Sequence, residues 1–337
     1  MIQEDQLAYD SEFIRERTFY PELCLIQLAT KNDIAVIDCQ AEIELDLLFS
    51  FLANYEGKII MHGCMQDLEI LSYRSSLPKN ICDTQLASGL TGFKPQIGLQ
   101  ALCDEMLGIN LPKTLSRSNW LKRPLSTEEI NYAADDVRYL IALFQMLSDE
   151  LVSLDRMSWF FEDCVTLKKE ATSDYPVKFL YKVLRSNKKP LVDPYHLLAL
   201  IQWREERAKK LNKPRQWILA DRYIKMLAFD RRFKLSNIPS KSEAFIAEAI
   251  DVISQEKNES NGLFNNTNNI LSPEESDYFY KNIETKASAL NIYKEVISSK
   301  VEVNGYLRGE PNNRYESSWR KQIIQDIQFK FSELNSS

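Results

Sequence analysis

Apolar and polar residues alternate over short runs at the start of the sequence and recur at helical spacing over most of the remainder. Three strand-like runs come first, over residues 7–13, 23–29 and 33–38. Their short connections favour an antiparallel meander. Apolar residues at helical spacing follow over residues 43–55, and a short buried strand at residues 59–62 leads into a helix over residues 65–73. This order of elements predicts a mixed α/β sheet flanked by helices.

Helical patterns dominate the rest of the chain. Ser126 and Glu129 form a capping-box signature ahead of a periodic stretch that reaches Leu151. A polar stretch at residues 254–269 interrupts the later helical patterns and predicts a surface loop. We therefore predict five segments: an α/β domain at residues 1–170, a linker at 171–190, an all-helical domain at 191–255, a flexible loop at 256–272 and a second helical domain at 273–337.

The composition is that of a globular protein and limits the partners it can have. Of the 337 residues, 44% are hydrophobic, which is enough to build a large core. The net charge of −6 supplies no general attraction for nucleic acid, so a polyanion would need local basic residues or bound cations. No apolar run is long enough to cross a bilayer and the N-terminus shows no signal-peptide pattern, so we expect a cytoplasmic protein without a membrane partner.

The same counts exclude several kinds of catalytic site. The 6 cysteines are scattered without short paired spacings, which argues against a zinc cage and against a disulfide scaffold. The 2 histidines, His62 and His196, are too far apart in the sequence to suggest a multi-histidine metal site. The sequence contains no phosphate-binding P-loop, no dinucleotide-binding glycine motif and no serine-nucleophile elbow. Carboxylates are the remaining candidates for catalysis.

Acidic residues at three places in the sequence are candidates for catalysis. Asp10 and Glu12 are two positions apart on the first strand, so their side chains project from the same face. Asp67 stands in the first turn of a helix, where the helix dipole stabilises a carboxylate. Tyr132 and Asp136 are one turn apart on a later helix. Each feature alone also fits a purely structural role, whereas a shared cation would make the whole group of like charges favourable.

Taken together, these stretches resemble the exonuclease motifs of the ribonuclease D family. The first motif is matched by residues 9–21 with the strand at 23–29, the second by residues 62–68 and the third by residues 132–137. The third match is typical of the tyrosine-bearing branch of the Asp-Glu-Asp-Asp exonucleases. Residues 83–85 and 113–125 match the pattern between the motifs, although Asn119 stands where relatives usually carry an acid.

Parts of the helical remainder resemble the helicase-and-RNase-D C-terminal (HRDC) domain. Residues 200–208, which include Trp203 and Arg204, carry the match together with residues 214–221. Residues 317–320 are similar to part of a diverged second copy. The resemblance implies an RNase H-like exonuclease core followed by one or two all-helical HRDC-type domains.

The family resemblance also implies a chemical role for the acids and the tyrosine. Four acids would bind two divalent cations, Mg²⁺ or Mn²⁺, because all-oxygen ligands suit hard cations. These acids are Asp10, Glu12, Asp67 and Asp136. Tyr132 would hydrogen-bond the attacking water and orient it. The implied activity is 3′-5′ exonuclease cleavage of RNA with release of 5′-nucleoside monophosphates, acting on the 3′ ends of structured precursors such as tRNA, and no obligate protein partner is evident.

Residues that contact RNA are a further expectation. Single strands are commonly held by backbone charge and by base stacking, and the candidates here are Phe13, Arg15, Arg17, Lys113 and Arg117. Phe13 fits a core position better than a surface one, and the basic residues fit a solvated loop equally well. Three alternatives remain open: a related exonuclease that acts on DNA, a scaffold that binds RNA without cleaving it, and a phosphodiesterase for short oligonucleotides.

Overall fold

The computed structural model describes most of the chain as two compact units. The described residues are 5–112, 118–173, 175–185, 194–229, 234, 245, 247–249, 251, 272–310, 313–316 and 319–336. The first unit draws its described residues from Met1–Ile14, Leu23–Thr172 and Asn269–Ser337, and the second from Arg15–Glu22 and Ser173–Asn268. None of the described helices is long and apolar enough to span a membrane.

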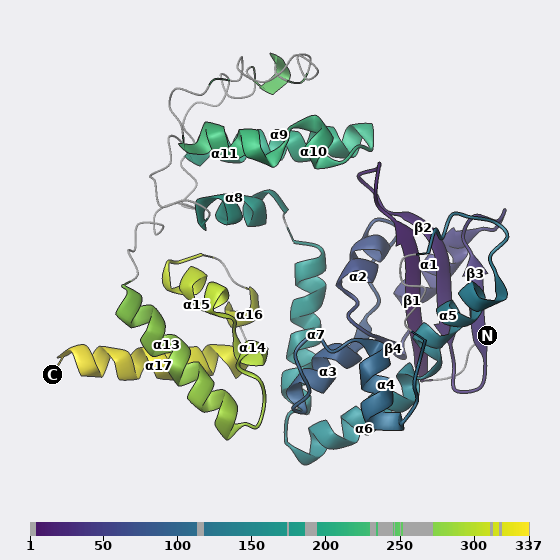
Figure 1. Ribbon diagram of the computed structural model, residues 1–337, viewed down its shortest axis with the longest axis horizontal. Coiled ribbons are helices and arrows are strands. Elements are labelled where there is room, and N and C mark those ends of the chain that lie inside the picture. The colour runs from purple at the N-terminus through teal and green to yellow at the C-terminus, as the bar shows by residue number, and fades with distance from the viewer. Residues whose placement is uncertain are drawn as a thin grey trace. The chain divides into compact units, whose positions relative to one another are not determined.

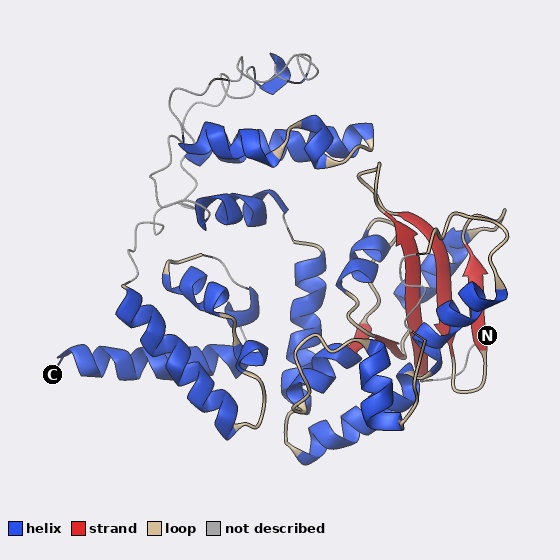
Figure 2. Cartoon of the chain, in the orientation of Figure 1, coloured by secondary structure: helices blue, strands red, loops and turns tan. Residues whose placement is uncertain are grey.

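The first unit is built on a mixed sheet of five strands (Figures 1 and 2). The strands are β1 (Gln6–Ile14), β2 (Glu22–Ala29), β3 (Ile34–Asp38), β4 (Lys58–Met61) and β5 (Asn80–Asp83). Their order is β3-β2-β1-β4-β5, with β1 parallel to β4, β4 parallel to β5 and β2 antiparallel to β3. β1 is therefore the central strand, and the sheet confirms the predicted mixed α/β architecture.

Helices of the first unit pack on both faces of this sheet. They are α1 (Leu45–Asn54), α2 (Met65–Ser72), α3 (Thr84–Leu90), α4 (Leu99–Leu107), α5 (Thr127–Arg138), α6 (Leu140–Ser153) and α7 (Met157–Ala171). On β1, Leu7 belongs to a core cluster that includes Phe49 of α1, whereas Ala8 belongs to the cluster that includes Phe144 of α6. The alternation of neighbouring residues between two cores is what the two-residue period of a strand requires.

Two elements of this unit differ from the expectation. The capping box of Ser126 and Glu129 opens α5 as predicted, but α5 ends at Arg138 instead of continuing to Leu151. Tyr132 of α5 packs in a cluster beside β2, whereas Val137 at the end of α5 joins the main core that α6 fills. Strand β5 is missing from the predicted elements, since its four residues are too few to show a period.

The second unit combines the non-helical segment Arg15–Glu22 with a helical part from residue 175 onward. Its helices are α8 (Tyr175–Arg185), α9 (Pro194–Leu211), α10 (Arg215–Ile218) and α11 (Asp221–Phe229). α8 lies inside the segment predicted to be a linker, residues 171–190, because Phe179 and Val183 pack in one cluster with Leu200 of α9. The predicted loop at residues 256–272 lies outside the described residues apart from Ser272.

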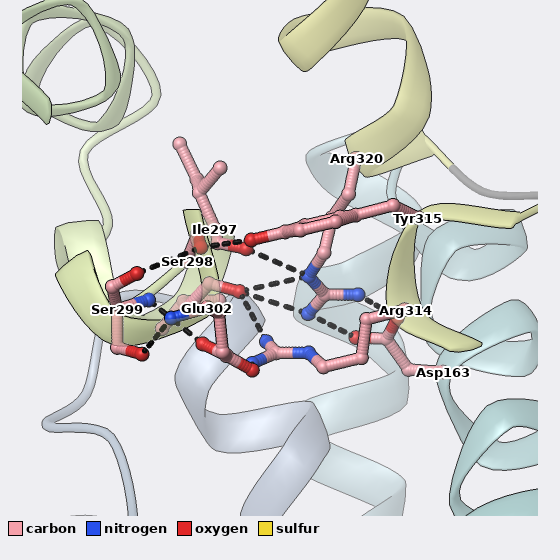
Figure 3. A network of polar contacts seen from close by, with 9 residues as sticks. Asp163, Ile297, Ser298, Ser299, Glu302, Arg314, Tyr315 and Arg320 are labelled. Atoms are coloured by element: carbon pink, nitrogen blue, oxygen red, sulfur yellow. Dashed lines mark hydrogen bonds and ion pairs between the residues drawn. The ribbon is translucent and has the colours of Figure 1, made fainter. Parts of the chain in front are cut away.

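The C-terminal helices share the core of the first unit. They are α13 (Pro273–Ala289), α14 (Lys294–Ile297), α15 (Lys300–Leu307), α16 (Asn313–Glu316) and α17 (Trp319–Ser336). Phe279 and Trp319 lie in the same hydrophobic cluster as Leu143 and Phe160. Figure 3 shows a polar network that joins α17 to Asp163 of α7. Residues 273–337 are thus helical in their described part, as expected, and their core is continuous with that of the α/β domain.

Candidate active site

Three of the four predicted acidic ligands converge beside the central strand. Asp10 and Glu12 stand on β1, two residues apart, and Asp136 comes from α5. One carboxylate oxygen from each of these residues lies within 4.8 Å of the others, a grouping that could hold a metal ion. The strand supplies two acids from one face, as their spacing predicts, and the helix supplies the third, as the family resemblance implies.

The fourth acid, Asp67, stands next to this group but outside it. Its carboxylate is on the first turn of α2 and is 7% exposed. The hydroxyl of Ser11 donates a hydrogen bond to Asp67 Oδ1 at 2.5 Å. Because Ser11 lies between Asp10 and Glu12, this bond ties α2 to the strand that carries two of the ligands.

The electrostatics of the group favour a bound cation. Burial, reinforced by Asp136 and Asp67, raises the pKa of Glu12 to about 8. Burial, together with Asp135 and Asp67, raises the pKa of Asp136 to about 7. Burial and the neighbouring acids also hold the pKa of Asp10 well above its ordinary value. Such carboxyls retain protons near neutral pH unless positive charge is placed between them.

Asp67 is affected in the same direction but less strongly. Burial raises its pKa to about 6, and the hydrogen bond from Ser11 acts in the opposite direction. The donors in the whole group are carboxylate oxygens, which is the ligand chemistry that Mg²⁺ and Mn²⁺ prefer. The residues present therefore fit a centre for hard divalent cations.

Tyr132 lies one turn before Asp136 on the same helix. Its side chain is 8% exposed, and its ring centroid lies 6.1 Å from that of Trp120. Burial, followed by the charges of Asp136 and Glu12, raises the pKa of its hydroxyl. The phenol therefore stays protonated near neutral pH and can donate as well as accept a hydrogen bond.

The predicted RNA-contact residues have different surroundings, so far as the structure describes them. Phe13 is partly buried against the core cluster of Leu7. Arg15 belongs to the second unit, where its Nε donates to the carbonyl oxygen of Phe19 at 3.1 Å. Arg17 is exposed in the same unit. Lys113 and Arg117 lie outside the described residues.

Two residues at the site were not singled out from the sequence. Ser11 lies between two same-face acids, so its side chain points to the other side of the strand, but nothing in the sequence indicates that Asp67 meets it there. Asp83 stands at the end of β5, and its carboxylate accepts hydrogen bonds from the turn that precedes α2. Its only signal in the sequence was the local motif of residues 83–85.

Known proteins resemble the chain in sequence and in fold. Residues 2–152 match a family model described as 3′-5′ exonuclease. Ribonuclease D of Desulfotalea psychrophila is 30% identical over 354 residues, covering 97% of this chain and 92% of that protein. Ribonuclease D of Acidiphilium cryptum is 36% identical over 233 residues, and the match spans 68% of this chain but only 59% of that relative. The crystal structure of Escherichia coli RNase D superposes with a TM-score of 0.81 at 21% identity, covering 97% of this chain and 94% of that one.

Proposed function

The chain belongs to the ribonuclease D family, and we propose that it is a 3′-5′ exoribonuclease that uses two divalent cations, Mg²⁺ or Mn²⁺. The observation that carries the proposal is the convergence of Asp10, Glu12 and Asp136 within 4.8 Å, with raised carboxyl pKa values and with Tyr132 one turn away. The products would be 5′-nucleoside monophosphates.

Each acidic residue has a defined part in this proposal. Asp10, Glu12 and Asp136 would hold the cations, and Asp67 would contribute from α2. Bound cations would activate the attacking water and stabilise the departing 3′ oxygen of the ribose. Ser11 fixes one oxygen of Asp67, so the carboxylate of Asp67 is oriented before any substrate arrives.

Tyr132 would position the attacking water. Its raised pKa excludes a phenolate as the general base near neutral pH. A protonated hydroxyl can still hydrogen-bond the water and aim it at phosphorus, and such positioning is a large part of enzymatic rate enhancement. We therefore assign Tyr132 to orientation and the acids to cation binding.

We propose the 3′ ends of structured RNA as the substrate, with tRNA precursors as the leading case. The Escherichia coli protein with the same fold is described as an exoribonuclease involved in structured RNA processing. The net charge of −6 gives no general attraction for RNA, so cations bound at the acids would supply much of the local positive charge. The helical second unit is the candidate for additional RNA contacts.

A labelled-RNA digestion tests the proposal. The substrates are a single-stranded RNA, an RNA hairpin with a 3′ tail and a DNA of the same sequence as the single strand. We expect 5′-labelled RNA to shorten progressively from the 3′ end with Mg²⁺ or Mn²⁺, and 3′-labelled RNA to release a labelled 5′-mononucleotide at once. EDTA should stop both reactions. Faster degradation of the DNA, or binding of RNA without cleavage, would contradict the proposal.

A further inference from the structure

The carboxylate of Asp83 joins two backbone segments at the ends of β4 and β5. It is 2% exposed, and it accepts hydrogen bonds from Gly63 N at 3.1 Å and from Cys64 N at 3.0 Å. It also accepts from Gln85 N at 2.7 Å and from Leu86 N at 3.3 Å, in the first turn of α3. A single buried carboxylate thus accepts hydrogen bonds from four backbone N–H groups, two in the turn after β4 and two in the turn after β5.

The turn held by Asp83 leads directly into α2. Cys64 is the N-cap residue of α2, and its side chain makes no capping hydrogen bond. Gly63 has φ +64°, a left-handed conformation that favours glycine, and a Cβ there would lie 3.3 Å from the side-chain amide of Gln85. The path of this turn is therefore fixed by Asp83 and by the glycine rather than by a cap within α2.

A second layer of hydrogen bonds makes the same sheet edge rigid. Nε2 of His62 lies 2.9 Å from the carbonyl oxygen of Ile97, which only accepts, so Nε2 carries a proton. Burial lowers the pKa of His62, so the ring is neutral near pH 7. Its Nδ1 lies 2.8 Å from the Thr84 hydroxyl, which also donates to the Met61 carbonyl oxygen at 3.0 Å. Gln85 Nε2 donates to the same Ile97 carbonyl at 3.0 Å. Both ring nitrogens of His62 are therefore engaged in structural contacts.

We propose that Asp83 is a positioning residue for the metal site. Asp67 is three residues beyond Cys64, so the turn that Asp83 holds sets where the Asp67 carboxylate stands. Ser11 holds that carboxylate from the side of β1. Asp67 is thus located between two anchors, one on the ligand-bearing strand and one at the end of β5. The inference rests on the proposed function, since it assigns Asp67 to cation binding.

Binding of Mn²⁺ to the substrate-free protein tests this role. In Asp83→Asn, an oxygen at the Oδ1 position still accepts from Gly63 N, Gln85 N and Leu86 N, but an amide group replaces the Oδ2 that accepts from Cys64 N. The substitution should therefore release the N-cap residue of α2. We expect about tenfold weaker Mn²⁺ binding by calorimetry and by electron paramagnetic resonance, as for other residues that orient metal ligands. Gly63→Ala strains the same turn with Asp83 intact and should weaken Mn²⁺ binding in the same way.

Ser272→Ala is the matched control. Ser272 is the N-cap of α13 and accepts from Glu275 N, so its loss removes a helix cap in the same unit without touching the turn before α2. We expect this variant to lower the melting temperature and to leave Mn²⁺ affinity unchanged. The inference is overturned if folded Asp83→Asn or Gly63→Ala binds Mn²⁺ as the wild type does.

Mn²⁺ binding and RNA degradation by the wild-type protein show which of the two proposals fails. If it binds Mn²⁺ but does not degrade RNA, the proposed function fails while the role of Asp83 is still decided by the two turn variants. If the wild type does not bind Mn²⁺, both proposals fail together.

Discussion

Two groups of partly or fully buried acids in the first unit are stabilised in opposite ways. In the C-terminal network, Asp163 accepts from both terminal nitrogens of Arg320, and the two side chains are each 3% exposed. In the same network, Arg314 Nη1 donates to Glu302 at 2.6 Å (Figure 3). Burial alone would raise the pKa of Glu302, but Arg314 and Ser299 hold it below its ordinary value.

The acids of the candidate active site differ from this network in the part of the chain that the structure describes. Among the described residues, no Lys or Arg forms an ion pair with Asp10, Glu12 or Asp136. Their pKa values are raised, whereas that of Glu302 is lowered. Acids neutralised by the protein's own arginines stabilise the fold. Acids gathered without a cation support the proposal that this group binds one from solution.

The largest effect should come from removing one unpaired acid. Asp136→Asn should lower the rate of RNA hydrolysis by about 10³-fold, because a cation contribution of about 4 kcal/mol to transition-state stabilisation would be lost. Denaturation of the metal-free variant should show no loss of stability, since a repelling charge has been removed. Rates under single-turnover conditions, measured beside urea unfolding, check both statements. If this variant hydrolyses RNA at the wild-type rate, the assignment of Asp136, and with it α5, to the catalytic site is wrong.

Breaking the Asp163–Arg320 ion pair should have the opposite effect: it should lower the stability of the fold. Asp163→Asn leaves Arg320 buried without a counter-charge, which typically costs about 3–5 kcal/mol of folding free energy. Urea unfolding provides the measurement. The matched control is Asp277→Asn, whose partner Lys300 and whose own side chain are largely exposed, so its loss should cost less than about 1 kcal/mol. Equal effects of the two substitutions would show that burial does not distinguish these pairs.

The active-site half of this comparison could be anticipated from the sequence because its signals are local. The spacing of Asp10 and Glu12 places them on one face of a strand, and the spacing of Tyr132 and Asp136 places them on one face of a helix. The hydrogen bond between Ser11 and Asp67 joins residues 56 positions apart, and no local pattern reports such a contact. The part of each site residue in catalysis stays a proposal that the variants above test.

The C-terminal network shows why other parts of the fold could not be predicted. Trp203-Arg204 and Trp319-Arg320 are the same dipeptide, and both arginines are buried. Arg204 pairs with Asp221, which lies in its own helical unit. Arg320 instead pairs with Asp163, which is 157 positions away on α7. The dipeptide indicates neither partner, because the choice of partner depends on tertiary packing.

Replacing Tyr132, the uncharged residue of the candidate active site, should have a smaller effect. Tyr132→Phe should lower the turnover number by about 100-fold, because the attacking water loses one of its orienting hydrogen bonds. Mn²⁺ affinity should stay unchanged, since the acids are intact. Steady-state kinetics beside calorimetry separate the two quantities. A loss of Mn²⁺ binding that matches the loss of turnover would mean that Tyr132 supports the acids rather than the water.

The two clusters should respond to pH with opposite signs, and this is the smallest effect. With folded pKa values of about 8 for Glu12 and about 7 for Asp136, the metal-free protein should lose stability as pH rises from the ordinary carboxyl range towards pH 8, because the unfolded chain releases these protons first. Glu302 has a lowered pKa, so its contribution is present above the ordinary range and is lost as pH falls.

Melting temperatures of the metal-free protein between pH 3 and pH 9 measure how stability changes with pH on the acid side and on the alkaline side. Glu12→Gln should flatten the alkaline side, and Glu302→Gln should flatten the acid side. Saturating Mg²⁺ should cancel the alkaline loss in the wild type, because the bound cation then plays the part at Asp10, Glu12 and Asp136 that arginines play in the C-terminal network. If the alkaline slope is the same in the wild type and in Glu12→Gln, the unpaired acids are not the source of the pH dependence, and the contrast between the two clusters does not hold in solution.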